Sequence, residues 1–197
     1  MQARQKRRHH KCRIRKNQID QMKPLLHYPA AFPLAIKFMN PTLAESVTLR
    51  PAQPDDESFL LQLYRDTRAE EIAAWGWDEA QQQAFLSMQF RARTLSYSAY
   101  PNTEHSIILE AERPIGRLLI SRMESEIRLV DIALLSKTRG QGIGAKLISN
   151  LLTRATREAT PVRLHVEKFN RALRLYQRLG FQVLEDTGTQ FFMEWRG

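Results

Sequence analysis

Cysteine is almost absent from this chain of 197 residues, in which Cys12 is the only one. A single cysteine excludes an intrachain disulfide framework and a cysteine-based zinc site. His9 and His10 lie beside Cys12, but a folded metal site needs more ligands than these, so we expect no bound metal. Because Cys12 lies far along the chain from the motifs described below, we expect no catalytic role for it.

Long apolar runs are also missing. A transmembrane helix needs an apolar stretch of about 18 residues or more, and none occurs, so we expect no membrane span. Hydrophobic residues make up 43% of the chain and charged residues 26%, which is ordinary for a soluble globular protein. The length suits one domain and hardly two. We expect a cytoplasmic protein.

Acidic residues are scarce at the N-terminus. Residues 1–38 hold ten basic side chains and one acid, Asp20, and the rest of the chain carries equal numbers of both, so the net charge of +9 belongs to this segment. Residues 1–38 have three interpretations. The first is a silent, disordered extension, with Met39 as an alternative start. The others are a basic arm that binds nucleic acid or anionic lipid, and a targeting segment. We favour the first reading, with a domain over 39–197, and do not expect nucleic acid as a partner.

Glycine is sparse as well, with eight in the chain, yet three of them fall within residues 139–144, Arg-Gly-Gln-Gly-Ile-Gly. This stretch lies between an apolar run, 127–135, and a pattern of helical spacing, 145–159. A strand that ends in such a loop and opens into a helix presents a row of backbone N–H groups to an anion. The spacing matches neither the P-loop nor the dinucleotide-binding fingerprint. A plain helix-start loop is the alternative.

The remaining pattern predicts an α/β protein with a mixed sheet. Helices are expected after a cap at Asp55 or Asp56, as a short turn over 70–77, and from a cap at Asp78 to about Tyr97. Strands and later helices are expected in the following ranges: strands 46–51, 106–111, 115–123, 127–135, 162–166, 181–184 and 190–195; helices 145–159 and 170–179.

A second motif follows the strand at 162–166. Together with the glycine loop it resembles the GCN5-related N-acetyltransferase (GNAT) family, from about Ser46 to the C-terminus. The family's phosphate loop, Arg/Gln-x-x-Gly-x-Gly/Ala, is matched by Arg139, Gly142 and Gly144. Its later helix, N-x-x-A-x-x-L-Y-x-x-x-G-F, is matched by Ala172, Leu175, Tyr176, Gly180 and Phe181, with Asn170 one position after the motif's asparagine.

The resemblance implies the GNAT acyl-CoA N-acyltransferase fold. This fold has a central, mostly antiparallel sheet of about six to seven strands with flanking helices. Its middle strands, 127–135 and 162–166 here, splay apart and admit the pantetheine arm of the cofactor. The implied co-substrate is acetyl-CoA and the implied acceptor is a primary amine, with no metal.

The resemblance also implies the cofactor-binding residues. Backbone groups of Ile132 and Leu134 would bind the pantetheine amides, and an N–H near Leu134 would stabilise the developing oxyanion. Both are equally explained as apolar strand residues. Asn170 would bind the pantetheine or only cap its helix. The pyrophosphate would lie on the loop and helix start, which comprise Arg139, Gly140, Gln141, Gly142, Ile143, Gly144 and Ala145.

Tyr176 matches the family's general acid, which protonates the leaving thiolate; the alternative is a core aromatic. The base is less clear, because the histone-modifying members carry a glutamate where this chain has Arg128. A lysine amine is neutral roughly once in 2,500 at pH 7, and an N-terminal amine about once in six, so the former needs a base more. The candidates are Asp131, Glu126, Glu110 and His165, or a water relay. Asp131 could instead pair with Arg117 or Arg128.

Residues before the first long strand correspond to the family's acceptor-recognition region, although helix packing explains them as well. They are Phe90, Arg91, Arg93, Tyr97 and Tyr100. The sequence thus predicts an N-acetyltransferase, with a homodimer kept as an option. One alternative is a non-catalytic acyl-CoA-binding sensor or degenerate member of the family. Another is nucleic-acid binding through residues 1–38.

Overall fold

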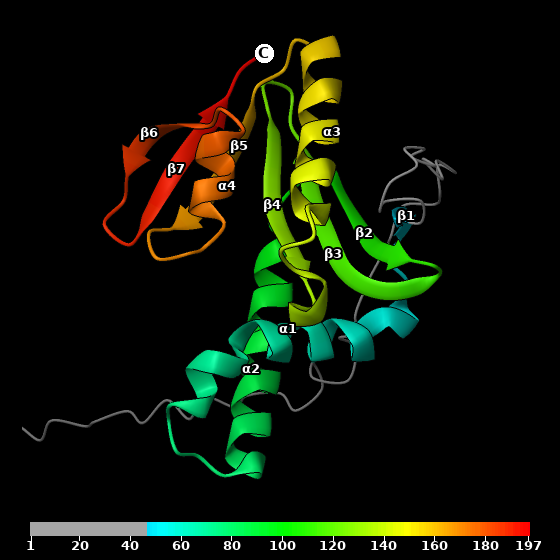
Figure 1. Ribbon diagram of the computed structural model, residues 1–197, viewed down its shortest axis with the longest axis vertical. Helices are drawn as coiled ribbons and strands as arrows, with labels where there is room; N and C mark the ends of the chain where they lie inside the picture. The colour runs from blue at the N-terminus through cyan, green and yellow to red at the C-terminus, as the bar shows by residue number, and fades with distance from the viewer. Residues whose placement is uncertain (1–46) are drawn as a thin grey trace, which may run out of the picture. The chain divides into compact units, whose positions relative to one another are not determined.

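A computed structural model describes residues 47–197. The basic segment 1–38, Cys12 and the alternative start at Met39 lie outside the described residues. Figure 1 shows a central sheet with helices on both faces. In chain order the elements are β1 (Val47–Pro51), α1 (Glu57–Ala73), α2 (Glu79–Tyr97), β2 (Thr103–Glu110), β3 (Arg113–Arg122), β4 (Ile127–Leu134), α3 (Ile143–Arg157), β5 (Val162–Glu167), α4 (Leu173–Arg178), β6 (Gln182–Asp186) and β7 (Gln190–Trp195). Short 3-10 turns at Pro54–Asp56 and Ser136–Thr138 precede α1 and follow β4.

The sheet has seven strands in the order β1-β2-β3-β4-β5-β7-β6. All neighbours are antiparallel except β4 and β5, which are parallel. A parallel pair needs a crossover, and α3 supplies it. The predicted fold class and element order are therefore confirmed.

Helices α3 and α4 pack on one face of the sheet. The residues of α3 that repeat at helical spacing, such as Leu147, Leu151 and Ala155, are all buried there. Pro161 follows the helix, and a residue at positive φ, Ala159, completes the turn into β5. This face of the sheet holds the larger part of the core. Because α3 packs there along its length, its first turn lies near the C-terminal end of β4.

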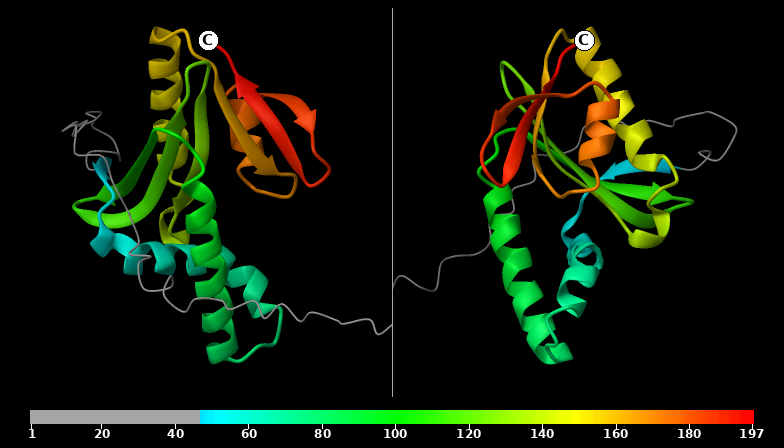
Figure 2. Two further views of the ribbon diagram at one scale, coloured as in Figure 1. Left: turned by 180° about the vertical axis from the view of Figure 1, so that it is seen from behind. Right: turned by 60° about the vertical axis from the view of Figure 1, so that its left-hand side comes forward.

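Helices α1 and α2 pack on the opposite face, against β2, as Figure 2 shows from behind. Tyr64 and Phe90 meet there with ring centroids 5.9 Å apart. The short helical turn expected over 70–77 is wrong, because α1 continues unbroken to Ala73. Its sequence contains no helix breaker before Gly76, which has φ +67°.

The expected caps were right at one helix and wrong at another. Asp78 accepts the N–H of Gln81 at 2.8 Å and caps α2. Asp56 makes no capping bond to α1 and instead binds the guanidinium of Arg50 at 2.7 Å. Within residues 47–197, none of the helices has the length and apolar character to cross a membrane.

Candidate functional site

The parallel strands β4 and β5 separate partway along their length. They pair only from Ile127 to Leu129 on β4 and from Val162 to Leu164 on β5. The register between β3 and β4 shifts at the same level, since Leu119 faces Asp131 while Ile120 faces Leu129. Val130 is therefore an extra residue, a β-bulge, which bends β4 at the point of separation. The expected splayed pair is present (Figure 1).

The backbone of β4 beyond the bulge points into this gap. The N–H of Leu135 bonds to Ile115 O on β3 at 2.8 Å. Because hydrogen-bonded and non-hydrogen-bonded pairs alternate in an antiparallel ladder, Ala133 also bonds to β3, whereas Ile132 and Leu134 direct their N–H and C=O groups away from β3. That is the edge where β5 no longer pairs. Ile132 thus offers both backbone groups to the gap, and Leu134 offers its N–H, since Leu134 O accepts from Arg139 Nε.

The glycine loop leads directly into α3. Gly140 and Gly142 have φ +76° and +82°, values that side-chain-bearing residues rarely adopt, and a Cβ at either would meet no atom within 4 Å. Helix α3 begins at Ile143, two residues earlier than expected. The backbone N–H groups of residues 141–145 find no acceptor among the described residues. They form an open row of donors at the positive end of the helix dipole.

Gly144, on the first turn of α3, lies close to the end of β4 and to α4. A Cβ there would lie 3.9 Å from side chains of Leu134, at the end of β4, and Leu175, on α4. A larger side chain would therefore displace α4 from the loop. The donor row, the gap beside β4 and the first turn of α4 are consequently held together in one place.

Asp66 of α1 holds the loop and was not recognised in the sequence. Its carboxylate accepts the N–H and the hydroxyl of Ser136 at 2.7 and 2.8 Å, and Arg139 Nη2 at 2.9 Å. Arg139 also donates Nε to Leu134 O at 2.8 Å. The side chain of Arg139 therefore ties β4 and α1 to the loop, so its first role is to position the donor row.

Tyr176 lies on α4 with only 7% of its surface exposed. Its ring packs edge-on against Phe181, with centroids 5.6 Å apart. Its hydroxyl has no hydrogen-bond partner among the described residues. Burial, with a smaller effect from the negative charge of Asp131 on β4, raises the pKa of Tyr176 well above its usual value. The phenol thus remains protonated and able to donate.

Asn170 precedes α4, which starts at Leu173, later than expected. Its Oδ1 accepts the N–H of Ala172 at 2.8 Å, which shapes the turn into the helix. The N-cap of α4 is Ala172, so Asn170 does not cap the helix itself. The turn occupies its oxygen and leaves its Nδ2 donors unpaired among the described residues.

Asp131, the first candidate base, is held by two guanidinium groups. Arg93 Nη2 lies 2.8 Å from Oδ1, and Arg117 Nε lies 2.5 Å from Oδ2. Tyr97 links the two arginines, accepting from both. The expected partner Arg117 is correct and Arg128 is not. Both oxygens of this carboxylate are therefore occupied by guanidinium donors.

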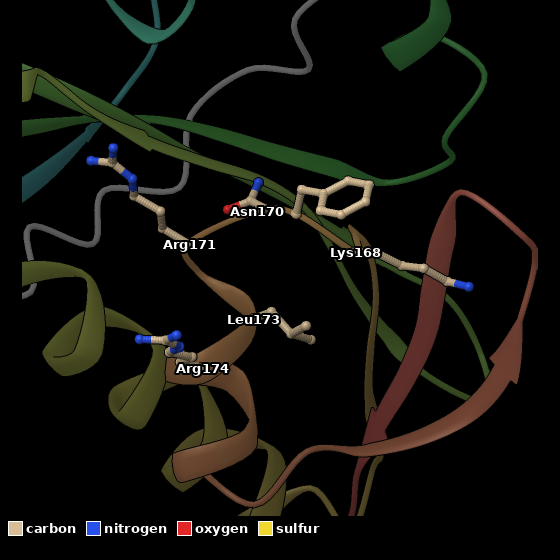
Figure 3. Close-up of a pocket in the computed structure, with 6 residues that line it drawn as sticks. Lys168, Asn170, Arg171, Leu173 and Arg174 are labelled. Carbon is tan, nitrogen blue, oxygen red and sulfur yellow. The ribbon is translucent and has the colours of Figure 1, made fainter. Parts of the chain in front are cut away.

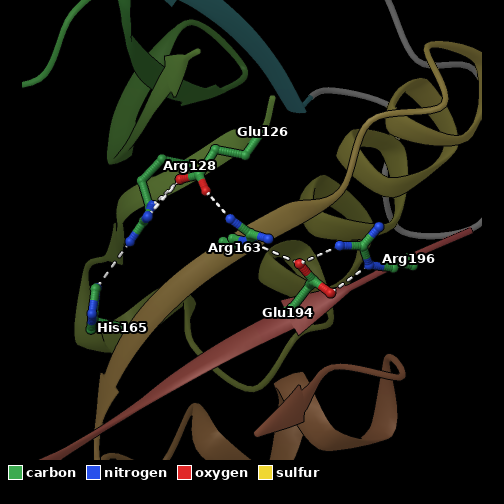
Figure 4. Close-up of polar contacts among 6 residues, drawn as sticks. All are labelled: Glu126, Arg128, Arg163, His165, Glu194 and Arg196. Carbon is green, nitrogen blue, oxygen red and sulfur yellow. Dashed lines mark hydrogen bonds and ion pairs between the residues drawn. The ribbon is translucent and has the colours of Figure 1, made fainter. Parts of the chain in front are cut away.

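Glu126 is similarly occupied. It is 5% exposed, and its two oxygens bind Arg128 and Arg163 at 2.5 and 2.7 Å. Arg163 also binds Glu194 of β7, which in turn binds Arg196, so the charges form a chain across three strands (Figure 4). This is a structural network of ion pairs.

The other two candidate bases are also unsuited. His165 of β5 stacks on Phe192, 4.8 Å between centroids, and its Nδ1 lies 3.1 Å from Arg128 Nη1. Burial, then the charge of Arg128, lowers the pKa of His165. Glu110 ends β2 and pairs with Val47 of β1, three strands away from the gap. None of the four predicted candidates is therefore a free base at the gap, and no group of three potential metal ligands occurs in residues 47–197.

The expected acceptor region divides into two parts. Phe90 is buried against Tyr64, so helix packing explains it. Arg93 and Tyr97 join the Asp131 cluster, beside the gap. A separate cavity of about 520 Å³ opens at the segment between β5 and α4; Lys168, Phe169, Asn170, Arg171, Leu173 and Arg174 line it.

The comparisons with known proteins agree with this geometry. Residues 50–181 match the acetyltransferase (GNAT) family. A PaiA N-acetyltransferase from Thermoplasma acidophilum, solved in complex with coenzyme A, superimposes with a TM-score of 0.61 at 17% identity, covering 77% of this chain and 99% of that one. A ribosomal-protein-S18-alanine N-acetyltransferase from Escherichia coli gives 0.55 at 16% identity, covering 76% and 93%. An acetyltransferase from Thermus thermophilus gives 0.58 at 18% identity, covering 77% and 97%. A search of curated proteins found no match.

Proposed function

The chain belongs to the acetyltransferase (GNAT) family, and on that premise we propose that it transfers the acetyl group of acetyl-CoA to a primary amine. One observation carries the proposal. A buried phenol without a partner, Tyr176, stands beside a gap between parallel strands, and a row of free backbone N–H groups lies where the neighbouring helix begins. These are an acid and an anion site, next to each other.

The residues present fit coenzyme A. Its pyrophosphate would accept from the N–H groups of residues 141–145, because Gly140 and Gly142 leave open space on that side. A charge at a helix N-terminus is stabilised by about 0.3–1 kcal/mol when exposed and up to about 2 kcal/mol when partly buried. The pantetheine amides would bond to Ile132, Leu134 and the Nδ2 of Asn170, as an added strand does.

Acetyl-CoA supplies a thioester whose carbonyl carbon an amine attacks. The Leu134 N–H, directed into the gap, would donate to the carbonyl oxygen as its negative charge grows. Tyr176 would give the proton of its hydroxyl to the sulfur as the C–S bond breaks, and the attacking nitrogen would lose a proton to water, from which the phenolate regains one. Because the pKa of Tyr176 is raised by burial, the hydroxyl keeps its proton over the whole range in which an amine becomes neutral.

The acceptor amine, we infer, arrives largely neutral. The carboxylates of Asp131 and Glu126, two of the predicted bases, are each bound by two arginines. Without these two as bases, an amine of low pKa such as a peptide α-amine reacts far more readily than a lysine side chain. The Escherichia coli neighbour is named for acetylation of an alanine.

The same observation supports a second candidate, a protein that binds acyl-CoA without catalysis. Arg128 occupies the position where histone-modifying relatives carry a basic glutamate, and it is bound to Glu126. A cytoplasmic location, a homodimer and any role of residues 1–38 stay predictions.

The test measures turnover of acetyl-CoA with a panel of amines, and the readout is release of the coenzyme A thiol. We expect acetyl-CoA to raise the melting temperature and an α-amine acceptor to release thiol. Tyr176→Phe keeps the contact with Phe181 and should lower kcat by about 10²- to 10⁴-fold, with cofactor affinity unchanged. The melting temperature of Tyr176→Phe without ligand is the control for its fold.

Two results would decide against parts of this proposal. Unchanged turnover in Tyr176→Phe would remove the acid role from Tyr176. Tight binding of acetyl-CoA with no thiol release from any amine would favour the non-catalytic binder.

A further inference from the structure

The cavity between β5 and α4 is strongly basic. Three of its six lining residues are cations, Lys168, Arg171 and Arg174, and none is an acid. The sequence motif that ends at Phe181 spans this segment, yet the arginines are not among the motif residues. A concentration of positive charge around a cavity of about 520 Å³ favours a polyanionic ligand.

The three cations differ in how far they are already engaged. Lys168 lies 2.6 Å from Asp186 and over the ring of Phe191. Arg171 forms one long contact, 3.2 Å, with Glu70, and both side chains are more than 80% exposed. Arg174 has no partner among residues 47–197. Arg174, and Arg171 after it, are therefore available to a ligand.

These two arginines face the donor row of α3. Figure 3 shows Arg171 and Arg174 projecting from the segment on the side where α3 runs, whereas Lys168 extends the opposite way. Leu175, next to Arg174, lies within contact distance of a Cβ placed on Gly144. Arg171 and Arg174 thus project toward α3, whose first turn carries the proposed pyrophosphate site.

Coenzyme A carries a third phosphate, on the 3′ position of its ribose, one sugar away from the pyrophosphate. We propose that Arg174, assisted by Arg171, binds this 3′-phosphate, so that the protein selects coenzyme A over its 3′-dephospho form. The inference rests on the proposed function, since it assumes that coenzyme A binds at α3. A guanidinium offers a planar pair of donors that matches two phosphate oxygens. A nucleic-acid strand fits less well, because a backbone needs a row of cations, and two are free here.

The experiment is a thermodynamic cycle in which the Arg174 side chain and the 3′-phosphate of the ligand are each removed, and the four binding affinities are compared. Calorimetry measures the affinities of the full chain for coenzyme A and for 3′-dephospho-coenzyme A, in the wild type and in Arg174→Ala. We expect the wild type to prefer coenzyme A by about tenfold or more, and Arg174→Ala to lose most of that preference. Its affinity for the dephospho form should change by less than about twofold, and Arg174→Lys should fall between the two.

Arg157→Ala is the matched control. Arg157 is also an exposed helical arginine without a partner among the described residues, but it lies at the far end of α3. It should leave both affinities unchanged. Since Arg174 is exposed, the variant should keep the wild-type melting temperature without ligand.

Equal wild-type affinities for the two ligands would overturn this inference and leave the proposed function standing. A preference that survives in both Arg174→Ala and Arg171→Ala would overturn it too. Failure of both ligands to bind the wild type would instead contradict the proposed function itself.

Discussion

Arg128 Nη1 lies 3.1 Å from Nδ1 of His165, across the parallel strands β4 and β5 (Figure 4). A guanidinium only donates, so Nδ1 must accept, and the neutral imidazole carries its proton on Nε2. Neither ring nitrogen then has a free lone pair for an amine proton. Arg128 thus occupies the acceptor nitrogen of His165.

Arg128→Gln should raise the pKa of His165. Burial is the larger cause of the lowered pKa, and the positive charge of Arg128 is the next. The variant removes that charge and the donor to Nδ1, so the imidazolium form becomes less costly. Titration of the His165 ring by NMR, assigned with His165→Gln, measures the change. The His105 signal is an internal control, because Arg117, not Arg128, acts on it. A lower or unchanged pKa of His165 would contradict the assigned tautomer.

Gly142→Glu should abolish binding of coenzyme A. The side chain enters the open space beside the donor row, and its carboxylate competes with and repels the pyrophosphate. Gly188→Glu is the matched control, since Gly188 has φ +89° and equally open surroundings in the turn between β6 and β7. Both variants carry the strain of a positive φ, roughly 1 kcal/mol. Calorimetry should show normal affinity for the control alone; normal affinity in Gly142→Glu would remove the loop from the cofactor site.

The glycine loop and the order of elements could be predicted because both are local. Glycine spacing, helical periodicity and the cap at Asp78 each depend on residues within a few positions of one another. The loop's anchor, Asp66, lies 70 residues before Ser136 in the sequence. Nothing near Asp66 distinguishes it from a solvated acid on α1.

The ion pairs could not be predicted for the same reason. Arg128 and Arg163 become direct neighbours only because β4 and β5 pair in this register. Two adjacent arginines repel each other unless an acid lies between them, and Glu126 takes that place. From the sequence, Glu126 is predicted only as a candidate base. The bulge at Val130 likewise depends on the register with β3.

Glu126→Gln should destabilise the fold by about 3 kcal/mol or more. The substitution leaves Arg128 and Arg163 side by side without the buried negative charge between them. Glu124→Gln, two residues away, is the control, because Glu124 is exposed and has no partner among the described residues. Urea unfolding should give a change within about 0.5 kcal/mol for the control. Equal stability of the two variants would show that the network is not structural.

His105 makes the stability depend on pH. It lies on β2, and its Nε2 is buried without a partner among the described residues. Burial, and then the charge of Arg117, lowers the pKa of His105 to about 4, against the opposing effect of Asp131 and Asp56. The unfolded chain, with a histidine pKa of about 6.5, binds more protons between these two values. Stability from this group is therefore complete above about pH 6.5 and is lost as the pH falls towards 4.

His105→Gln should remove that dependence. Between pH 7 and pH 4.5 we expect the wild type to lose about 2–3 kcal/mol more unfolding free energy than the variant, measured by urea unfolding. Carboxylates with lowered pKa, such as Asp56 and Glu194, lose their contribution at lower pH, so they do not obscure this window. His165→Gln is the control and should change the slope less, since that ring is more exposed. Parallel curves for wild type and His105→Gln would mean that the imidazole is solvated in the folded protein.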